Sequence, residues 1–473
     1  MIKSLFQYAP VQIFSALSVF ILIAVQTRFL QASEYGYLAI FLVISEVLRA
    51  VSAQWLNTSL IRFYPSAELA DRNKFVNIIL QTMLTLFIPA IIILIICVFF
   101  VVESFDITLT LSLIGLLITK SIFTLYQELA RLNENVKKYR LSTIVNSGLS
   151  IIFSMIFLSY NSSVISAILA ISLSYLFSLF FIIFKTNIKF ISWSDPLLIK
   201  IARYGLPLML SGLISALSSR IDRFFIASEM GMTETGVYSV LSNTFMGLIA
   251  LIFMAVALPL YPNLARDVTN KKKLYQSHSD YLSILFTISL PALIGLCFIS
   301  EPLIRLFLST EYLEYGVELS WILACSFFIL NFKMHYIDHG LQFTSNTKYY
   351  PIISVLSIVI NVIILIMMLP HFGLYAAALS SLITNVIALT VSFFISIKLG
   401  YKFKLDKDLI YILISAMLMI ISLIILDFFV TSSVSDFYYI LISIVFGVAV
   451  YFLSMFLFNV LKIRSKVMEK INA

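Results

Sequence analysis

The chain has 473 residues, of which 61% are hydrophobic and 12% charged, with a mean hydropathy of +1.02 and a formal net charge of +8. A soluble protein of this length would need far more polar surface to cover its core, so the composition excludes a soluble fold and makes the bilayer the main solvent of the side chains. The apolar residues form many runs of about 18–25 residues, bounded by charges or turn residues, which also excludes a soluble domain on a single anchor.

Fourteen apolar runs follow one another along the chain, each long enough to cross a membrane as a helix. They are expected at residues 10–30, 36–57, 75–101, 107–130, 139–160, 164–184, 201–227, 235–262, 280–300, 317–339, 350–370, 373–398, 408–430 and 437–461. Lys3 precedes the first run and no convincing cleavage site follows it, so we interpret that run as an uncleaved span. No run alternates with a period of two, which argues against a β-barrel. The predicted fold class is an all-α integral membrane protein with about fourteen transmembrane helices.

Lys and Arg residues gather on one side of these spans. With the N-terminus inside, most of them fall in the inner loops and the C-terminal tail, and Arg28 and Arg305 lie at the outer side. Because cytoplasmic loops carry an excess of Lys and Arg, we expect both termini to be cytoplasmic. The basic loops then face anionic membrane lipids, which accounts for the net charge without nucleic acid as a partner.

The two halves of the chain resemble each other. Residues Arg28–Gly36 and Arg223–Gly231 are identical at six of nine positions, and each is followed by an apolar span that ends in a Tyr-Pro pair, at Tyr64 and Tyr261. An even number of spans separates the copies, which predicts a parallel repeat about a pseudo-twofold axis along the membrane normal. The predicted divisions are a six-helix N-terminal lobe at 1–200, a six-helix C-terminal lobe at 201–400, and an extra helix pair with a basic tail at 401–473.

Four segments of the second half carry a resemblance to a known family. They are Arg203–Pro207, Ser219–Phe225, Gly236–Ser239 and the region from Asn361 to Ala378. They resemble the polysaccharide-transport flippases of the multidrug/oligosaccharidyl-lipid/polysaccharide superfamily, which includes O-antigen flippases. The resemblance implies transport of an undecaprenyl-diphosphate-linked oligosaccharide from the cytoplasmic to the periplasmic leaflet of a bacterial inner membrane. The implied partners are this polyprenyl-diphosphate-linked glycan and, as a candidate, polysaccharide polymerase machinery.

Seven ionisable residues lie inside the predicted spans, where a basic side chain at the bilayer centre costs roughly 2.5–3.5 kcal/mol. Structural pairing is one interpretation, since Glu46 and Arg49 share a helix face, and snorkelling is another for bases near the outer end of span seven. The bases outnumber the carboxylates, however, and this surplus suits an anionic headgroup such as a diphosphate. The candidate substrate-binding residues are Arg49, Lys120, Arg220, Arg223 and Lys333. The candidates for ion coupling or structural pairing are Glu46 and Asp222.

Metal and cofactor sites are not expected. His335, Asp338 and His339 share a face of span ten and could form a metal site or a protonation-sensitive gate, but the group lies at the inner end, where headgroup contacts are expected. The three cysteines have no ligand spacing, and the chain has no Gly-rich phosphate loop, which argues against direct use of ATP. We predict no cofactor and no catalytic residue.

Two other functions stay open. A cation-coupled drug antiporter of the same superfamily is one, and it would be expected to keep unpaired carboxylates in its spans. A membrane enzyme of the polymerase or ligase type is the other, and it would need a longer external loop than the one at 301–316. For the flippase we expect alternating access of the two lobes to the two sides of the membrane.

Overall fold

The structure is a computed structural model that describes residues 2–66, 69–102, 106–183, 191–193, 195–218, 220–308, 310–313, 315–430, 434–462 and 464–465. Every regular element in these ranges is helical. Thirteen helices are long and apolar enough to cross a membrane, and a further apolar helix, Val164–Leu179, is shorter. The predicted fold class, an all-α membrane protein of about fourteen transmembrane helices, is confirmed.

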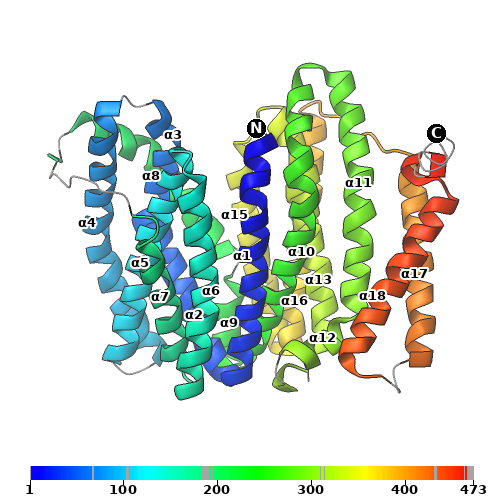
Figure 1. The fold of residues 1–473 in the computed structure, drawn as a ribbon, viewed down its shortest axis with the longest axis horizontal. Coiled ribbons are helices and arrows are strands. Elements are labelled where there is room, and N and C mark those ends of the chain that lie inside the picture. The colour runs from blue at the N-terminus through cyan, green and yellow to red at the C-terminus, as the bar shows by residue number, and fades with distance from the viewer. Residues whose placement is uncertain are drawn as a thin grey trace. The chain divides into compact units, whose positions relative to one another are not determined.

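The chain divides into two compact units, Met1–Ser239 and Val240–Ala473, which we describe separately. The first unit contains α1 (Ile2–Phe29), α2 (Ala32–Arg49), the π-helical turn η1 (Ala50–Gln54), α3 (Trp55–Phe63), η2 (Tyr64–Ser66), α4 (Leu69–Val102), α5 (Ile107–Leu132), α6 (Val136–Tyr160), α7 (Val164–Leu179), α8 (Pro196–Ser218), α9 (Asp222–Glu229) and the start of α10 (Met232–Arg266). Helix α7 packs against both α5 and α6, and α1 packs against α6 (Figure 1).

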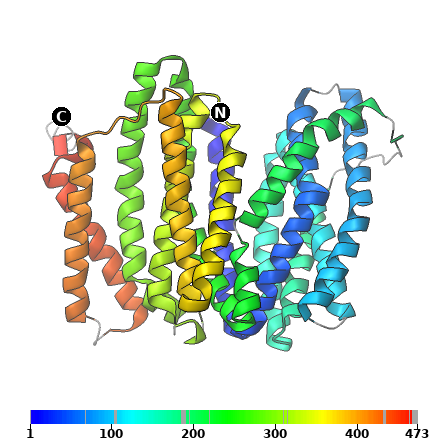
Figure 2. The ribbon, with the colours of Figure 1, turned by 180° about the vertical axis from the view of Figure 1, so that it is seen from behind.

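The second unit continues from α10. It contains η3 (Asp267–Thr269), α11 (Lys271–Phe298), α12 (Ser300–Phe307), η4 (Thr310–Tyr312), α13 (Gly316–Phe332), the π-helical turn η5 (Lys333–Ile337), α14 (His339–Phe343), α15 (Tyr349–Phe372), α16 (Leu374–Lys398), α17 (Asp408–Val430), α18 (Asp436–Leu457) and η6 (Val460–Lys462). Helix α16 packs against α13 and α15, and the C-terminal pair α17 and α18, orange and red in Figure 2, packs against α11. The division into lobes at 1–200, 201–400 and 401–473 stays a prediction.

The surface of α4 shows why the chain needs a bilayer. Leu84, Ile88 and Ile92 follow one another at a spacing of four residues, and each is 54–62% exposed. Residues four apart lie on one face of a helix, so these side chains form an apolar stripe that turns away from the protein. The opposite side of the helix is buried, at Met83 and Leu94 among others. An apolar outer face combined with a packed inner face is what lipid as a solvent requires.

Two predicted spans are less regular than the sequence suggested. The second, expected at 36–57, extends continuously over Ala32–Phe63 but includes the wider turn η1. The seventh, expected at 201–227, is interrupted by a turn at residues 220–221 between α8 and α9. The π turn does not interrupt the apolar pattern of its span, whereas the break in the seventh span coincides with the charged residues Arg220, Asp222 and Arg223.

Helices α2 and α10 cross with their backbones in contact, inside the first unit. A Cβ atom added to Gly36 would lie 2.0 Å from the carbonyl oxygen of Met232, and one added to Gly236 would lie 1.8 Å from that of Ala32. Glycine is required at both positions because any side chain would overlap the other helix. The contact is reciprocal, as expected for two copies of a repeated unit that meet about a pseudo-twofold axis.

This crossing sets the register of the internal repeat. It relates Ala32 to Met232 and Gly36 to Gly236. Ala32 and Met232 are also the first residues of α2 and α10. The repeat therefore has an offset of 200 residues. The match between Arg28–Gly36 and Arg223–Gly231 suggested an offset of 195 residues. That offset is wrong, because it aligns the start of α2 with a residue inside α9 and not with the start of α10.

Candidate functional site

A three-residue cluster lies in the middle of the first unit. Glu46 Oε2 accepts hydrogen bonds from Arg49 Nη2 at 2.7 Å and Arg49 Nε at 3.0 Å. Glu46 Oε1 accepts one from Lys120 Nζ on α5. Glu46 and Lys120 lie near the midpoints of the candidate spans Ala32–Phe63 and Ile107–Leu132. The sequence predicted the pairing of Glu46 with Arg49 as one interpretation, but not the part played by Lys120.

The cluster has more positive than negative charge. Two cations share a single carboxylate, and the side chains of Arg49, Glu46 and Lys120 are 14%, 19% and 24% exposed, respectively. The Lys120 ammonium group also lies 5.8 Å from the ring centre of Tyr175. Partial exposure leaves donor groups of Arg49 and Lys120 within reach of a ligand, and the uncompensated charge favours an anion.

The π-helical turn η1 begins directly after Arg49. A π turn inserts an extra residue into the helix, and such turns occur often at functional sites. Gln54, at the end of this turn, places its Oε1 3.4 Å from Arg49 Nη2. The turn packs against α4 and α8. The wider turn therefore adds an exposed amide group to the surroundings of Arg49.

The interruption between α8 and α9 carries three of the predicted site residues. Arg220 lies in the turn and is half-buried, whereas Asp222 and Arg223 begin α9 and are buried. Asp222 Oδ1 accepts the backbone N–H of Arg223 at 2.9 Å, and Asp222 Oδ2 accepts the hydroxyl group of Tyr238. The same N–H also donates to the carbonyl oxygen of Arg220 at 3.3 Å, so the carboxylate shares a backbone donor at the start of a helix. Arg223 is 4% exposed, so its side chain turns into the protein and does not snorkel toward the headgroups.

Lys333 has a partner that the sequence did not identify. Its Nζ lies 2.8 Å from Asp338 Oδ2, and the side chains of Lys333 and Asp338 are 11% and 7% exposed. Asp338 Oδ1 accepts the hydroxyl group of Ser392 at 2.6 Å. Lys333 and Asp338 are five residues apart in the sequence, and the π-helical turn η5 brings them to the same side of the chain. Lys333 is therefore neutralised within the second unit and lies in a different unit from the other six candidates.

Asp338 and His339, two of the three polar residues that share a face of span ten, contact other side chains. His339 Nδ1 lies 3.4 Å from His278 Nε2, and the other ring nitrogen of His278 lies 2.9 Å from the hydroxyl group of Tyr401. Asp338 is engaged by Lys333 instead. In the part of the chain that the structure describes, no group of three or more His, Cys, Asp and Glu side chains could hold a metal ion.

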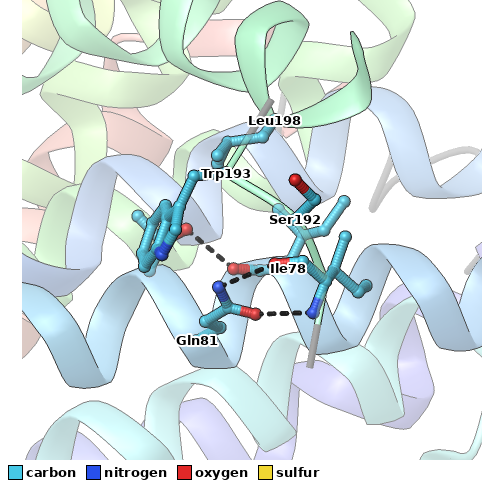
Figure 3. Close-up of a pocket in the computed structure, with 7 residues that line it drawn as sticks. Ile78, Gln81, Ser192, Trp193 and Leu198 are labelled. Atoms are coloured by element: carbon cyan, nitrogen blue, oxygen red, sulfur yellow. Dashed lines mark hydrogen bonds between the residues drawn. The ribbon is translucent and has the colours of Figure 1, made fainter. Parts of the chain in front are cut away.

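Ile191 and Asp195, which precede α8, each bond to a side chain of α4. The side-chain amide of Gln81 donates to Ile191 O and accepts from Ile191 N, both at 3.0 Å, as Figure 3 shows for the labelled Gln81. Further along, Lys74 Nζ lies 2.7 Å from Asp195 Oδ2. The hydrogen bond from Lys74 and a second from the backbone N–H of Leu197 lower the pKa of Asp195 below its ordinary value of 3.8. These contacts fix where α8 begins.

The chain matches the sequence profile of a family described as "Polysaccharide biosynthesis protein" over residues 25–318, more than half of its length. An uncharacterized membrane protein of Methanocaldococcus jannaschii is 27% identical over 197 residues, which cover 41% of this chain and 45% of that protein. The matched region thus spans less than half of the length of this curated relative.

Several solved transporters have the same fold. The lipid II flippase MurJ, in its inward closed conformation, superposes with a TM-score of 0.74 over 96% of this chain and 98% of its own, at 16% identity. An inward-facing multidrug resistance transporter of the MATE family gives 0.60 over 81% of this chain and 94% of its own, also at 16% identity. The MATE multidrug transporter DinF-BH gives 0.57 over 85% and 97%, at 17% identity. The fold is that of a multi-pass membrane transporter.

Proposed function

Because this chain belongs to the polysaccharide biosynthesis protein family, we propose that it is a flippase for a lipid-linked glycan. The substrate is an undecaprenyl-diphosphate-linked oligosaccharide, such as the repeat unit of an O-antigen or a similar surface polysaccharide. The protein moves it from the cytoplasmic to the periplasmic leaflet of a bacterial inner membrane by alternating access. The transporter fold and the surplus of basic side chains inside the spans support this proposal.

The cluster of Glu46, Arg49 and Lys120 is the main structural observation in favour of the flippase proposal. Burying two cations for one carboxylate halfway across a bilayer costs free energy, and a protein retains such an arrangement for a purpose. The diphosphate of a lipid-linked glycan is esterified at both ends, so it carries two negative charges, and its oxygens match the planar fork of a guanidinium group. When it enters, it supplies the negative charge that the cluster lacks.

The candidate residues divide into different roles in this proposal. Arg49 and Lys120 bind the diphosphate at mid-depth, and Arg220 receives it near the outer end of α8. Arg223 holds the start of α9 together with Asp222, so it positions the site. Lys333 supports the second unit through its pair with Asp338. If an ion drives transport, Glu46 is the better candidate for binding it, because Glu46 is more exposed than Asp222.

The test compares alanine variants of Arg49, Lys120 and Arg220 in cells whose surface glycan depends on this protein. We expect Arg49→Ala and Lys120→Ala to lose most surface glycan on a gel while their protein level on a blot stays near normal. Arg49→Lys should keep part of the activity, because lysine supplies the charge without the fork. Lys271→Ala, an exposed change at the start of α11, is the control and should keep full display.

Two results would contradict the proposal. Full glycan display by all three alanine variants would show that these charges do not bind the substrate. Normal display together with lost resistance to a cationic drug would instead support the antiporter.

A further inference from the structure

A pocket of about 460 Å³ lies between the last turn of α3 and the first turns of α8. Its lining residues are Phe63, Pro196, Ile199, Lys200, Arg203 and Tyr204. This lining, which we call the α3–α8 pocket, combines two cations with two aromatic rings and includes no carboxylate. Its volume is within the range of small-molecule sites. The hydropathy pattern does not reveal it, because α3 and α8 are separated by more than 130 residues.

The polar groups of the pocket are available to a ligand. Lys200 Nζ lies 5.0 Å from the ring centre of Phe63, and the same ring meets that of Tyr204 edge to face, with centroids 5.1 Å apart. A cation above a ring still has N–H groups to donate elsewhere. Arg203 is exposed, and no ion pair joins Lys200 or Arg203 to a carboxylate in the described ranges. Two unneutralised cations thus meet at one opening.

The walls of the pocket are fixed without a ligand. Gly205 approaches α3 so closely that an added Cβ would lie 2.2 Å from the ring of Trp55. At the other end, the pairs of Lys74 with Asp195 and of Gln81 with Ile191 hold the start of α8 against α4. The nearest carboxylate in the sequence, that of Asp195, is therefore already occupied. A site of this kind binds without first having to order itself, which favours affinity.

We propose that the α3–α8 pocket binds the phosphate of a lipid headgroup in the inner leaflet. Its depth fits this role, since the charge distribution places the start of α8 at the inner surface, where aromatic side chains gather at headgroup level. The inference rests on the proposed function and deepens it, because the pocket captures the diphosphate before it reaches Arg49 and Lys120. Helix α8 packs along α3, η1 and α2. It rises about 22 Å from Arg203 to Ser218, so the same helix lies beside the path of the headgroup from the pocket to the outer side.

The experiment measures lipid binding by native mass spectrometry of the purified full-length protein. The probes are undecaprenyl diphosphate, phosphatidylglycerol, phosphatidylcholine and, as a competitor, inorganic diphosphate. The variant Lys200→Gln/Arg203→Gln removes both charges from the pocket. The control Lys271→Gln/Lys272→Gln removes two exposed inner charges from the start of α11. Because all four side chains are exposed and lie near the starts of helices, the two variants perturb folding to a similar, small extent.

We expect the pocket variant to bind undecaprenyl diphosphate about tenfold more weakly, which corresponds to about 1.4 kcal/mol, while the control variant binds as the native protein does. Equal loss for phosphatidylglycerol would support a site for any phosphate-bearing lipid, and loss confined to undecaprenyl diphosphate would identify the transported lipid as the source. Unchanged binding of both lipids by the pocket variant would overturn the proposal. Arg49→Ala should lose transport and the binding at mid-depth but keep the binding that depends on Lys200 and Arg203, so a failure of the pocket proposal can be distinguished from a failure of the flippase proposal.

Discussion

Lys333 Nζ and Asp338 Oδ2 lie 2.8 Å apart across the π-helical turn η5, in a part of the second unit where both side chains are nearly inaccessible. The hydroxyl group of Ser392 satisfies the other carboxylate oxygen. Because Asp338 neutralises Lys333, this lysine no longer counts toward the surplus of basic over acidic side chains that the sequence indicated inside the spans. The remaining surplus of the candidate residues belongs to the first unit, in which four bases accompany Glu46 and Asp222.

The pair of Lys333 and Asp338 should be structural. Asp338→Ala leaves a buried ammonium group without its partner, which costs about 3–5 kcal/mol, so protein abundance and the midpoint of thermal unfolding should both fall. The double variant Lys333→Met/Asp338→Ala should recover much of that loss, because no buried charge remains. The measurement is thermal unfolding followed by size-exclusion chromatography of the detergent-solubilised protein. A Lys333→Met variant with native stability and no transport would show that Lys333 meets the substrate instead.

Glu46 should be coupled energetically to both of its cations. Glu46→Gln keeps the shape of the side chain but leaves Arg49 and Lys120 to repel each other, so stability should fall. In a double-mutant cycle with Lys120→Met, we expect a coupling of about 1–3 kcal/mol. A coupling near zero would mean that the contact between Glu46 and Lys120 adds nothing to stability.

The same Glu46→Gln variant tests ion coupling. If Glu46 binds a driving ion, transport by the variant should be slow and should no longer respond to an imposed proton or sodium gradient. The assay is glycan transport into vesicles with and without each gradient. Native transport that still follows the gradient would assign Glu46 to the structural cluster alone.

The crossing of α2 and α10 should not accept any side chain. Gly36→Ala and Gly236→Ala each place a methyl group within about 2 Å of a backbone oxygen, so we expect each to destabilise the protein by about 3 kcal/mol or more. Gly247→Ala is the matched control on α10, because nothing lies within 4 Å of its added Cβ. The control should be neutral or slightly stabilising, since alanine favours a helix more than glycine does. Similar melting temperatures for all three variants would contradict the close crossing.

The proposed orientation can be checked with single cysteines in a cysteine-free background. Cysteines at Ser162 and Ser435, both exposed, should react with a membrane-impermeant thiol reagent once the outer membrane has been permeabilised. Cysteines at Lys138 and Lys272 should react only after the inner membrane is opened. Labelling of Lys272→Cys in intact cells would reverse the orientation or change the number of spans.

Much of the fold could be predicted from the sequence, because hydropathy alone defines where helices cross a bilayer. The positions of Glu46 and Lys120 in the middle of their spans followed directly from that pattern. What could not be predicted was their contact, since it joins residues 74 apart on two helices and depends on how those helices are rotated.

The register of the repeat could not be found in the same way. Arg28–Gly36 and Arg223–Gly231 match well by residue identity, but the structure relates the helix starts at Ala32 and Met232. Local sequence identity over nine residues is weaker evidence than a backbone crossing, because similar turns recur wherever helices begin. The pairing of Asp338 with Lys333 was likewise not predicted, because it depends on the π-helical turn, which the sequence pattern does not reveal.

The crossing at Gly36 and Gly236 has a consequence for how this protein can vary among its homologues. In most helix contacts a larger residue on one side can be offset by a smaller one on the other, so the two positions change together. Here each added atom would meet a main-chain oxygen of the opposite helix, and no substitution can make a main-chain atom smaller. The two positions therefore cannot compensate for each other. Where homologues keep this crossing, we expect both to remain glycine, without the correlated changes by which contacting residues are usually detected.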